Sequence, residues 1–400
     1  MFKINKRVFL DYASTTPIDK KVLKAMKPYF MDNFANPSGL YKEALVAKKA
    51  LEESRESVAK LTQSKPGEVI FTGSGTESDN LAILGVARAA YKKYGKELKN
   101  EKPHIITTAI EHIAVMESFA QLEKEGFDVT YLIPESDGRI SIDKFKRELC
   151  PETILCSVIL VNNEIGTIEP VREISVVIDR FKKEQNRAPD SFPFFHTDAS
   201  QAPNYLDVNI NKLGADLMVL DGSKIYGPKG VSCLIKKSFV PIEPISFGGK
   251  QELELRPATE NIPNIVGFAK ALEIAKNRRE KDSESVHDLQ KYFIEKIESE
   301  IPDAKINGSI KWRIPNNINI CLPGLNSEFA VIQLDEKGIG CSSMSACTNL
   351  SDNARSYVVD ALGDDCGGSS LRFSLGRENT KKDIDLVVTK LKEVINIQSK

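Results

Sequence analysis

Two residues that follow apolar runs can together carry amine chemistry. Lys224 stands in DGSKIYGPKG, directly after ADLMVL, and Asp198 ends the run FPFFHTD. A lysine amine can add to an aldehyde, and an aspartate can keep a ring nitrogen protonated so that the ring withdraws electrons. Taken singly, Lys224 can be a surface cation and Asp198 can cap the segment that follows it. Their shared position after strand-like runs favours a common site.

A third segment, FTGSGTESDN, has the composition of an anion-binding turn. It places Gly75 and Thr76 between a strand-like and a helix-like run, and Ser74 is followed three residues later by a glutamate, as in a capping box. Free N–H groups at a helix start attract phosphate. A Gly-Ser turn that only caps a helix is the commoner case. Combined with Lys224 and Asp198, however, the turn completes what pyridoxal phosphate (PLP) requires.

Three more polar residues occur close to strand-like runs. His112 follows HIITTA, Asn163 lies in ILVNNEIG, and Arg372 lies in SLRFSLGR. A histidine at a strand end can stack on a cofactor or move a proton, and an arginine can bind a carboxylate through two parallel hydrogen bonds. A lone histidine is more often a packing or capping residue, and Arg372 can equally belong to a surface ion pair.

The segment CSSMSACTN contains a candidate nucleophile. Cys347 is flanked by small polar residues without apolar periodicity, which is typical of an exposed loop. A thiolate on such a loop can approach a substrate and leave carrying sulfur. Cys341 is the rival nucleophile, and we rank it lower because it adjoins the strand-like GIG.

The elements that must position these residues alternate along the first two thirds of the chain. Helix-like stretches separate strand-like runs at residues 68–73, 104–110, 128–133, 153–164, 192–200, 215–223 and 230–237. This alternation predicts an α/β fold with a mostly parallel sheet and helices on both faces. Ligands of such sheets bind beyond the carboxyl ends of the strands, where the candidate residues occur.

The last third of the chain has a different pattern. Residues 265–301 predict one long connecting helix, because apolar residues recur at helical spacing opposite many charges. Shorter apolar runs and a final helix-like stretch at 381–398 predict a smaller α+β unit. We therefore expect a large domain of residues 16–262 and a small domain made of residues 1–15 and 263–400.

Composition argues against several classes of protein. The 55 basic residues nearly balance the 56 acidic ones, so no overall field recruits nucleic acid or an anionic membrane. No run approaches the length of a membrane span, and the N-terminus lacks the apolar stretch of a signal peptide. The seven cysteines form no CxxC pair and no zinc-like spacing with the four histidines. Their odd number and scatter favour a reducing cytoplasm over a disulfide framework.

Together these segments resemble the cysteine desulfurases, PLP enzymes of fold type I in the class V aminotransferase group. The resemblance covers nearly the whole chain and rests on the shared order of FLDYASTTP, ANPSG, FTGSGTESDNLAI, IEHIAV, VNNEIGTI, HTDASQ, KIYGPKG, RPAT, SSMSACT and LRFSLGR. It implies conversion of L-cysteine into L-alanine, with a persulfide formed on Cys347. The sulfur would pass to an acceptor in iron–sulfur cluster assembly or tRNA thiolation. The cysteine loop is similar to that of the long-loop branch, and a homodimer is implied.

The resemblance also implies a role for each matching residue. Lys224 would attach the cofactor and then move a proton, His112 would stack on the ring and deprotonate the amino acid, and Cys347 would attack the substrate sulfur. The cofactor contacts would come from Asp198, Gln201, Asn163, Gly75, Thr76 and Ser223, and from Thr259 across the dimer interface. Arg372, assisted by Asn36, would hold the cysteine carboxylate.

The chain departs from the family just before Lys224. Relatives usually carry Ser-Gly-His or Ser-Ala-His there, with the serine and histidine on the phosphate, whereas this chain has Asp221 and Ser223. Like charges at ~4 Å repel by about 4 kcal/mol at an effective dielectric near 20. Asp221 must therefore point away, be compensated by a cation, or weaken PLP binding. We expect PLP to bind, because the other contacts remain.

Two other functions stay open at this stage. One is a PLP-dependent aminotransferase or carbon–sulfur lyase that makes no persulfide. The other is a degenerate PLP-fold scaffold that only binds a sulfur-trafficking partner, which Asp221 and Ser223 suggest. The sequence does not name the sulfur acceptor or decide between cysteine and selenocysteine.

Overall fold

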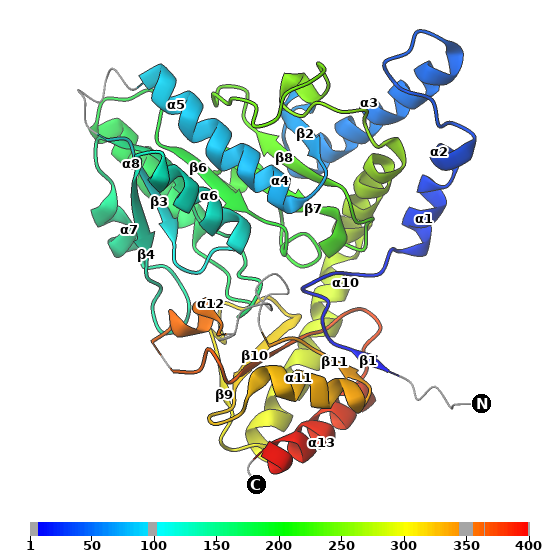
Figure 1. Ribbon diagram of the computed structural model, residues 1–400, viewed down its shortest axis with the longest axis vertical. Helices are drawn as coiled ribbons and strands as arrows, with labels where there is room; N and C mark the ends of the chain where they lie inside the picture. Colours follow the sequence, from blue (N-terminus) through cyan, green and yellow to red (C-terminus); the bar gives the residue numbers. More distant parts are fainter. Residues whose placement is uncertain (1–6, 95–101, 344–354, 364, 399–400) are drawn as a thin grey trace.

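The computed structural model describes residues 7–94, 102–343, 355–363 and 365–398. Its centre is a seven-stranded sheet in the order β2-β8-β7-β6-β5-β3-β4 (Figure 1). The strands are β2 (Val69–Thr72), β3 (His104–Thr108), β4 (Asp128–Leu132), β5 (Thr153–Ser157), β6 (Phe194–Asp198), β7 (Leu217–Asp221) and β8 (Ser232–Lys236). Neighbouring strands are parallel except for β8, which is antiparallel to β2 and β7. The predicted mostly parallel α/β sheet is confirmed.

Each strand of this sheet divides its side chains between two apolar layers. In β7, Leu217 and Val219 pack in one layer, whereas Met218 and Leu220 pack in the other. All four side chains are fully buried. Apart from the edge strand β4, which is only partly buried, the strands are buried on both faces, which explains why they are mainly apolar runs in the sequence. Helices therefore cover both faces.

Two groups of helices form these layers. α3 (Lys42–Thr62) packs against α10 (Ile262–Glu300), and both contribute to one layer. α4 (Gly75–Asn80), the π-helix η2 (Leu81–Gly85) and α5 (Val86–Tyr94) follow one another directly. η2 and α5 contribute with α6 (Ile113–Lys124) to the other layer. The remaining helices of the large-sheet part are α1 (Lys20–Met26), α2 (Pro28–Met31), α7 (Ile142–Glu148), α8 (Val171–Glu184) and α9 (Ile210–Leu213), with short 3-10 helices η1 (Pro66–Glu68), η4 (Gly222–Lys224) and η5 (Glu252–Glu254).

The long helix α10 connects the large sheet to the C-terminal part of the chain (Figure 1). Its 39 residues include the whole predicted stretch 265–301 except for the last residue, and its start lies three residues earlier. Near its C-terminal end, Phe293 meets Phe373 of the C-terminal sheet, with ring centroids 5.3 Å apart. The prediction of one connecting helix is confirmed.

The C-terminal part has its own antiparallel sheet in the order β12-β10-β9. The N-terminal strand joins this part, because β1 pairs in parallel with β11. These pairings support a division at residues 15 and 262, which we retain as a proposal. The elements are β1 (Val8–Phe9), β9 (Lys305–Ile306), β10 (Asn317–Cys321), α11 (Ser327–Glu336), β11 (Ile339–Gly340), α12 (Tyr357–Asp360), β12 (Ser370–Ser374) and α13 (Lys381–Gln398).

Cysteine pairing differs from the sequence-based expectation at one place. Cys321, at the end of β10, forms a disulfide with Cys366, and the two Cα atoms are 5.7 Å apart. The pairing of Cys321 with Ser370 in the β10–β12 ladder brings the two cysteines together, which their separation of 45 positions does not reveal. The other described cysteines, Cys150, Cys156, Cys233 and Cys341, are free.

Within the described ranges, no helix combines the length and the apolar character that crossing a membrane requires.

Candidate active site

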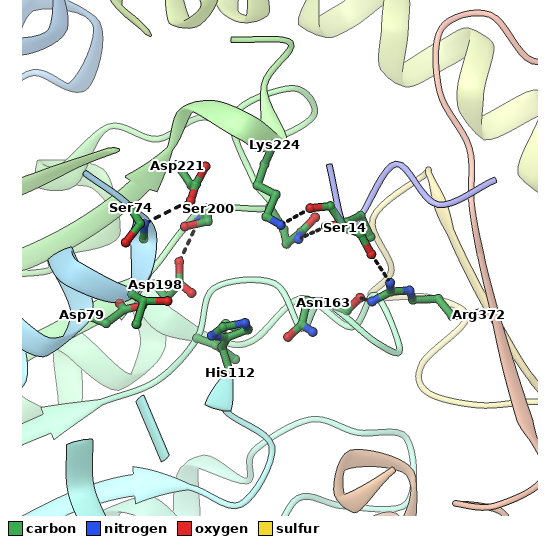
Figure 2. A pocket seen from close by; sticks show the side chains of 15 residues that line it. Ser14, Ser74, Asp79, His112, Asn163, Asp198, Ser200, Asp221, Lys224 and Arg372 are labelled. Carbon is green, nitrogen blue, oxygen red and sulfur yellow. Dashed lines mark hydrogen bonds between the residues drawn. The ribbon is translucent and has the colours of Figure 1, made fainter. Parts of the chain in front are cut away.

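The carboxyl ends of most strands of the large sheet meet at one edge. Because β8 is antiparallel to both of its neighbours, β2 runs in the same direction as β7 and the other parallel strands. Residues that follow these strands line a pocket at this edge, together with residues of the N-terminal segment and of β12 (Figure 2). The lining residues are Ala13, Ser14, Ser74, Gly75, Thr76, Asp79, His112, Ile159, Asn163, Asp198, Ser200, Gln201, Asp221, Lys224 and Arg372.

The amine of Lys224 is held by the N-terminal segment of the chain. Lys224 ends η4, directly after β7, and its Nζ donates a hydrogen bond to the carbonyl oxygen of Ser14. The backbone around it is fixed as well, because the Ser223 carbonyl accepts hydrogen bonds from both the N–H and the hydroxyl of Thr16, each at 2.8 Å. The Lys224 amine therefore has a defined position at the pocket.

The part of the pocket near Asp198 is strongly acidic. Asp198 ends β6, is 7% exposed and accepts a hydrogen bond from the Ser200 N–H at 2.9 Å. Asp79 lies beside it (Figure 2), and burial together with the charge of Asp198 raises the pKa of Asp79 well above its usual value. Behind them, burial lowers the pKa of His196 to about 3, so this histidine is neutral at pH 7. A cationic ring nitrogen would be stabilised here.

His112 caps the helix α6 at the pocket wall. Its Nδ1 accepts a hydrogen bond from the Ala114 N–H at 3.2 Å. Burial lowers the pKa of His112, although the charge of Asp198 opposes this effect. A neutral imidazole whose Nδ1 accepts carries its proton on Nε2, so His112 can present an N–H donor and an aromatic face to a ligand.

Arg372 is the buried cation of the pocket. It lies in β12 and is 1% exposed. Its guanidinium donates to the carbonyl oxygen of Asn163 at 2.9 Å, and to Asp11 and the Ser14 hydroxyl at 2.8 Å each. The Arg372 Nε and the Asn163 Oδ1 are buried without a hydrogen-bond partner in the part of the chain that the structure describes. Buried polar atoms of this kind are usually satisfied, which points to a ligand.

Asp221 points into the anion-binding turn and not away from it. Its Oδ2 accepts the N–H of Gly75 at 3.1 Å. Its Oδ1 accepts the N–H of Ser223 at 2.7 Å and the Ser223 hydroxyl at 2.6 Å. The first of the three possibilities considered for Asp221 is therefore wrong.

The structure gathers eight of the twelve predicted site residues into this pocket. Gln201 is among them and donates to the carbonyl oxygen of Ala13 at 2.9 Å. Ser223, Thr259 and Asn36 do not line the pocket within one chain. Thr259 lies in a separate hollow, and Asn36 is exposed. The proposed nucleophile Cys347 lies outside the described residues.

The described start of the cysteine loop lies next to Arg372. Backbone hydrogen bonds of 3.1 and 2.7 Å join Ser342 to Arg372 in both directions. Just before it, burial raises the pKa of Cys341 to about 12, so this thiol stays protonated at neutral pH. The described segment that precedes Cys347 therefore lies beside the pocket.

Sequence reasoning missed Ser14, Asp79 and Ser200 as pocket residues. Ser14 holds both Lys224 and Arg372, which follow it by 210 and 358 positions. Its position in FLDYASTTP, one of the segments that carries the family resemblance, was the available clue. Asp79 lies in the helical segment TESDN, where its burial beside Asp198 depends on the packing of α4 over the sheet.

The pocket fits the ring of PLP, with one departure at the phosphate end. A carboxylate for the ring nitrogen, an aromatic face, an amine and an unsatisfied amide oxygen surround one cavity. The carboxylate of Asp221 lies against the turn that would bind the phosphate and already accepts the Gly75 N–H. The residues thus suit the ring well and the phosphate less well.

Comparison with known proteins gives consistent matches over the whole chain. The sequence pattern of the class V aminotransferases matches residues 8–387. The chain is 40% identical over 395 residues to the cysteine desulfurase IscS of Clostridium botulinum (strain Hall), with 98% of this chain and 95% of that protein covered. It is 39% identical over 394 residues to the protein of the same name in Dictyoglomus turgidum, with the same coverage.

Comparison with solved structures shows a similar fold over nearly the whole chain. The fold is similar to that of a NifS-like protein, with a TM-score of 0.86, 29% identity and coverage of 98% of this chain and 100% of that chain. It is also similar to SspA in complex with cysteine, with a TM-score of 0.76, 34% identity and coverage of 92% and 98%.

Proposed function

Because this chain belongs to the cysteine desulfurases of the class V aminotransferase family, we propose that it converts L-cysteine into L-alanine and leaves the sulfur as a persulfide on Cys347. The observation that carries this proposal is the convergence of Lys224, Asp198 and Arg372 on one pocket. An amine, a carboxylate and a carboxylate-binding cation are the groups that PLP chemistry on an amino acid needs.

The cofactor would be PLP. When bound, it withdraws electrons from the α-carbon of an amino acid, so that bonds there and at the neighbouring carbon can break. Asp198 would keep the ring nitrogen protonated, His112 would cover one face of the ring, and Lys224 would attach the cofactor and carry a proton at Nζ. Further contacts would come from Asn163, Gln201, Gly75 and Thr76, with Ser223, and with Thr259 from a second subunit.

The sulfur transfer would be carried by Cys347. Its thiolate forms a bond to the substrate sulfur while the carbon–sulfur bond breaks. The electron pair of the broken bond stays on the carbon fragment, which takes up a proton and leaves as alanine. The family assignment and the position of Ser342 beside Arg372 support this role, because the loop begins at the pocket.

The reaction itself provides the test of this function. We expect the PLP-loaded chain to form one L-alanine for each sulfur atom released from L-cysteine, and the peptide that contains Cys347 to gain the mass of one sulfur atom. Amino-acid analysis and mass spectrometry measure the two quantities. Pyruvate with ammonia and no adduct would indicate a carbon–sulfur lyase, whereas amino transfer to a 2-oxo acid would indicate an aminotransferase.

Arg372 provides a second test, which concerns the substrate carboxylate. We expect Arg372→Lys to raise the KM for L-cysteine by at least about tenfold, because lysine lacks the planar fork that binds a carboxylate through two bonds. Steady-state kinetics measure KM and kcat separately, and the PLP absorbance checks that the cofactor site is intact. An unchanged KM would contradict the assignment of Arg372 to the substrate. Asn36 is an assisting residue in the same proposal.

We also propose a homodimer. Large apolar side chains are exposed around α1 to α3, including Phe30 (54%), Met31 (80%), Phe34 (74%) and Leu40 (96%). Exposed apolar patches of this kind usually mark an interface. The position of Thr259 outside the pocket supports a contribution to the pocket of a second subunit.

The sulfur acceptor would be a scaffold protein of iron–sulfur assembly or a tRNA-thiolation protein, and we retain the cytoplasm as the proposed location.

A further inference from the structure

The carboxylate of Asp221 satisfies the N–H that the cofactor phosphate would use. Gly75 begins the helical run of α4, η2 and α5, and its N–H already donates to Asp221 at 3.1 Å. The carboxylate is fixed from its other side by two hydrogen bonds from Ser223. The fixed carboxylate therefore takes the place of a ligand anion in this turn.

The guanidinium of Arg256 approaches this turn but pairs with a carboxylate other than Asp221. Arg256 approaches Gly73 at the same turn, but its Nε donates to Glu77 at 2.9 Å. Arg256 is thus engaged by Glu77, and Asp221 accepts hydrogen bonds only from uncharged donors at this turn, the Gly75 N–H and the Ser223 N–H and hydroxyl, among the described contacts. A dianionic phosphate bound at the Gly75 N–H would therefore meet the negative charge of Asp221 at close range.

We propose that Asp221 competes with the phosphate of PLP, so that this chain gains little affinity from the phosphate and holds the cofactor mainly by its ring and by Lys224. This inference rests on the proposed function, because it takes PLP as the cofactor. Asp221 then determines how strongly the site distinguishes PLP from pyridoxal, the same aldehyde without a phosphate. Because the phosphate adds little affinity, the fraction of chains that carry PLP rises and falls with the concentration of free PLP.

The test compares PLP with pyridoxal on the cofactor-stripped full-length chain. Dissociation constants come from absorbance titrations of the wild type, Asp221→Ser and Asp221→Asn. The matched control is Asp128→Asn. Asp128 is an exposed carboxylate at the first residue of β4, at the amino end of the strand and therefore away from the pocket. We expect both Asp221 variants to bind PLP at least about tenfold more tightly, which is about 1.4 kcal/mol, and pyridoxal within about threefold of the wild type.

A second measurement uses inorganic phosphate and no cofactor. Millimolar phosphate should raise the Tm of the cofactor-free Asp221→Ser and Asp221→Asn chains more than that of the wild type, because a ligand that binds the folded state stabilises it. Without phosphate, both variants should melt slightly below the wild type, since Asp221 caps η4. This readout is independent of the reaction.

The outcomes separate this inference from the proposed function. PLP affinity that is equal in the wild type and both Asp221 variants would overturn the competition, as would equal tightening toward pyridoxal or an equal phosphate effect on Tm. The PLP-dependent reaction would stand in each of those cases. If neither PLP nor pyridoxal bound to the wild type or to the Asp128→Asn control, the proposed function itself would fail.

Discussion

Replacing Lys224 by alanine should lower the rate of alanine formation from L-cysteine by at least about 10³-fold, within the range for loss of a proton-transferring group. Lys224 is the only lysine among the described residues that line the pocket. Its Nζ is held there by the carbonyl oxygen of Ser14. No other amine in the lining can take over attachment of the cofactor and movement of the proton. The measurement is kcat in the presence of saturating PLP.

Borohydride reduction tests directly whether Lys224 is the residue that attaches the cofactor. Reduction of the PLP-loaded wild type should leave the cofactor permanently attached to the peptide that contains Lys224, as seen by mass spectrometry. Lys229→Ala is the matched control, because Lys229 lies five residues after Lys224 in the same segment DGSKIYGPKG but is exposed and outside the pocket. Its activity and labelling should equal those of the wild type. Label on a different lysine would contradict the role given to Lys224.

The sheet and the general position of the site could be predicted from the sequence for one physical reason. Strands that are buried on both faces must be apolar throughout, so Leu217, Met218, Val219 and Leu220 form a continuous apolar run. A polar residue that directly follows such a run lies at the sheet edge. This argument applies to Asp198 and Lys224, and the structure places both in one pocket.

Other features depend on contacts that the sequence does not encode locally. Ser14 reaches Lys224 and Arg372 only because β1 pairs with β11, which brings the N-terminal segment to the pocket. The Cys321–Cys366 disulfide likewise depends on the antiparallel pairing of β10 and β12. Local apolar periodicity contains no information about such distant pairings.

The orientation of Asp221 could be predicted only in part from the sequence. The sequence identified its charge as a conflict with phosphate and left three outcomes. The structure decides against the first, because η4 begins directly after Asp221 and the carboxylate caps it while accepting the Gly75 N–H. Residue type predicted the conflict, but only the backbone geometry of this turn decides where the carboxylate points.

Replacing Cys347 by serine should reduce sulfur release from L-cysteine by more than about 10³-fold and leave the PLP absorbance unchanged. The physical reason is that a serine hydroxyl cannot accept sulfur as a persulfide, whereas the cofactor contacts come from other elements. The loop that contains Cys347 begins beside the pocket, since Ser342 pairs with Arg372 through two backbone hydrogen bonds. Sulfide release under reducing conditions and the cofactor spectrum are the two measurements.

The rival thiol, Cys341, provides the matched control for this experiment. Burial raises the pKa of Cys341 to about 12, so only a very small fraction is thiolate at neutral pH. We therefore expect Cys341→Ala to retain sulfur release within about twofold of the wild type. A packed, protonated thiol behaves as a small apolar side chain, and alanine replaces it without removing a reactive group. The opposite pattern, with loss in Cys341→Ala and activity in Cys347→Ser, would move the nucleophile to Cys341. It would also require that the Cys341 thiol leave its packed position during turnover.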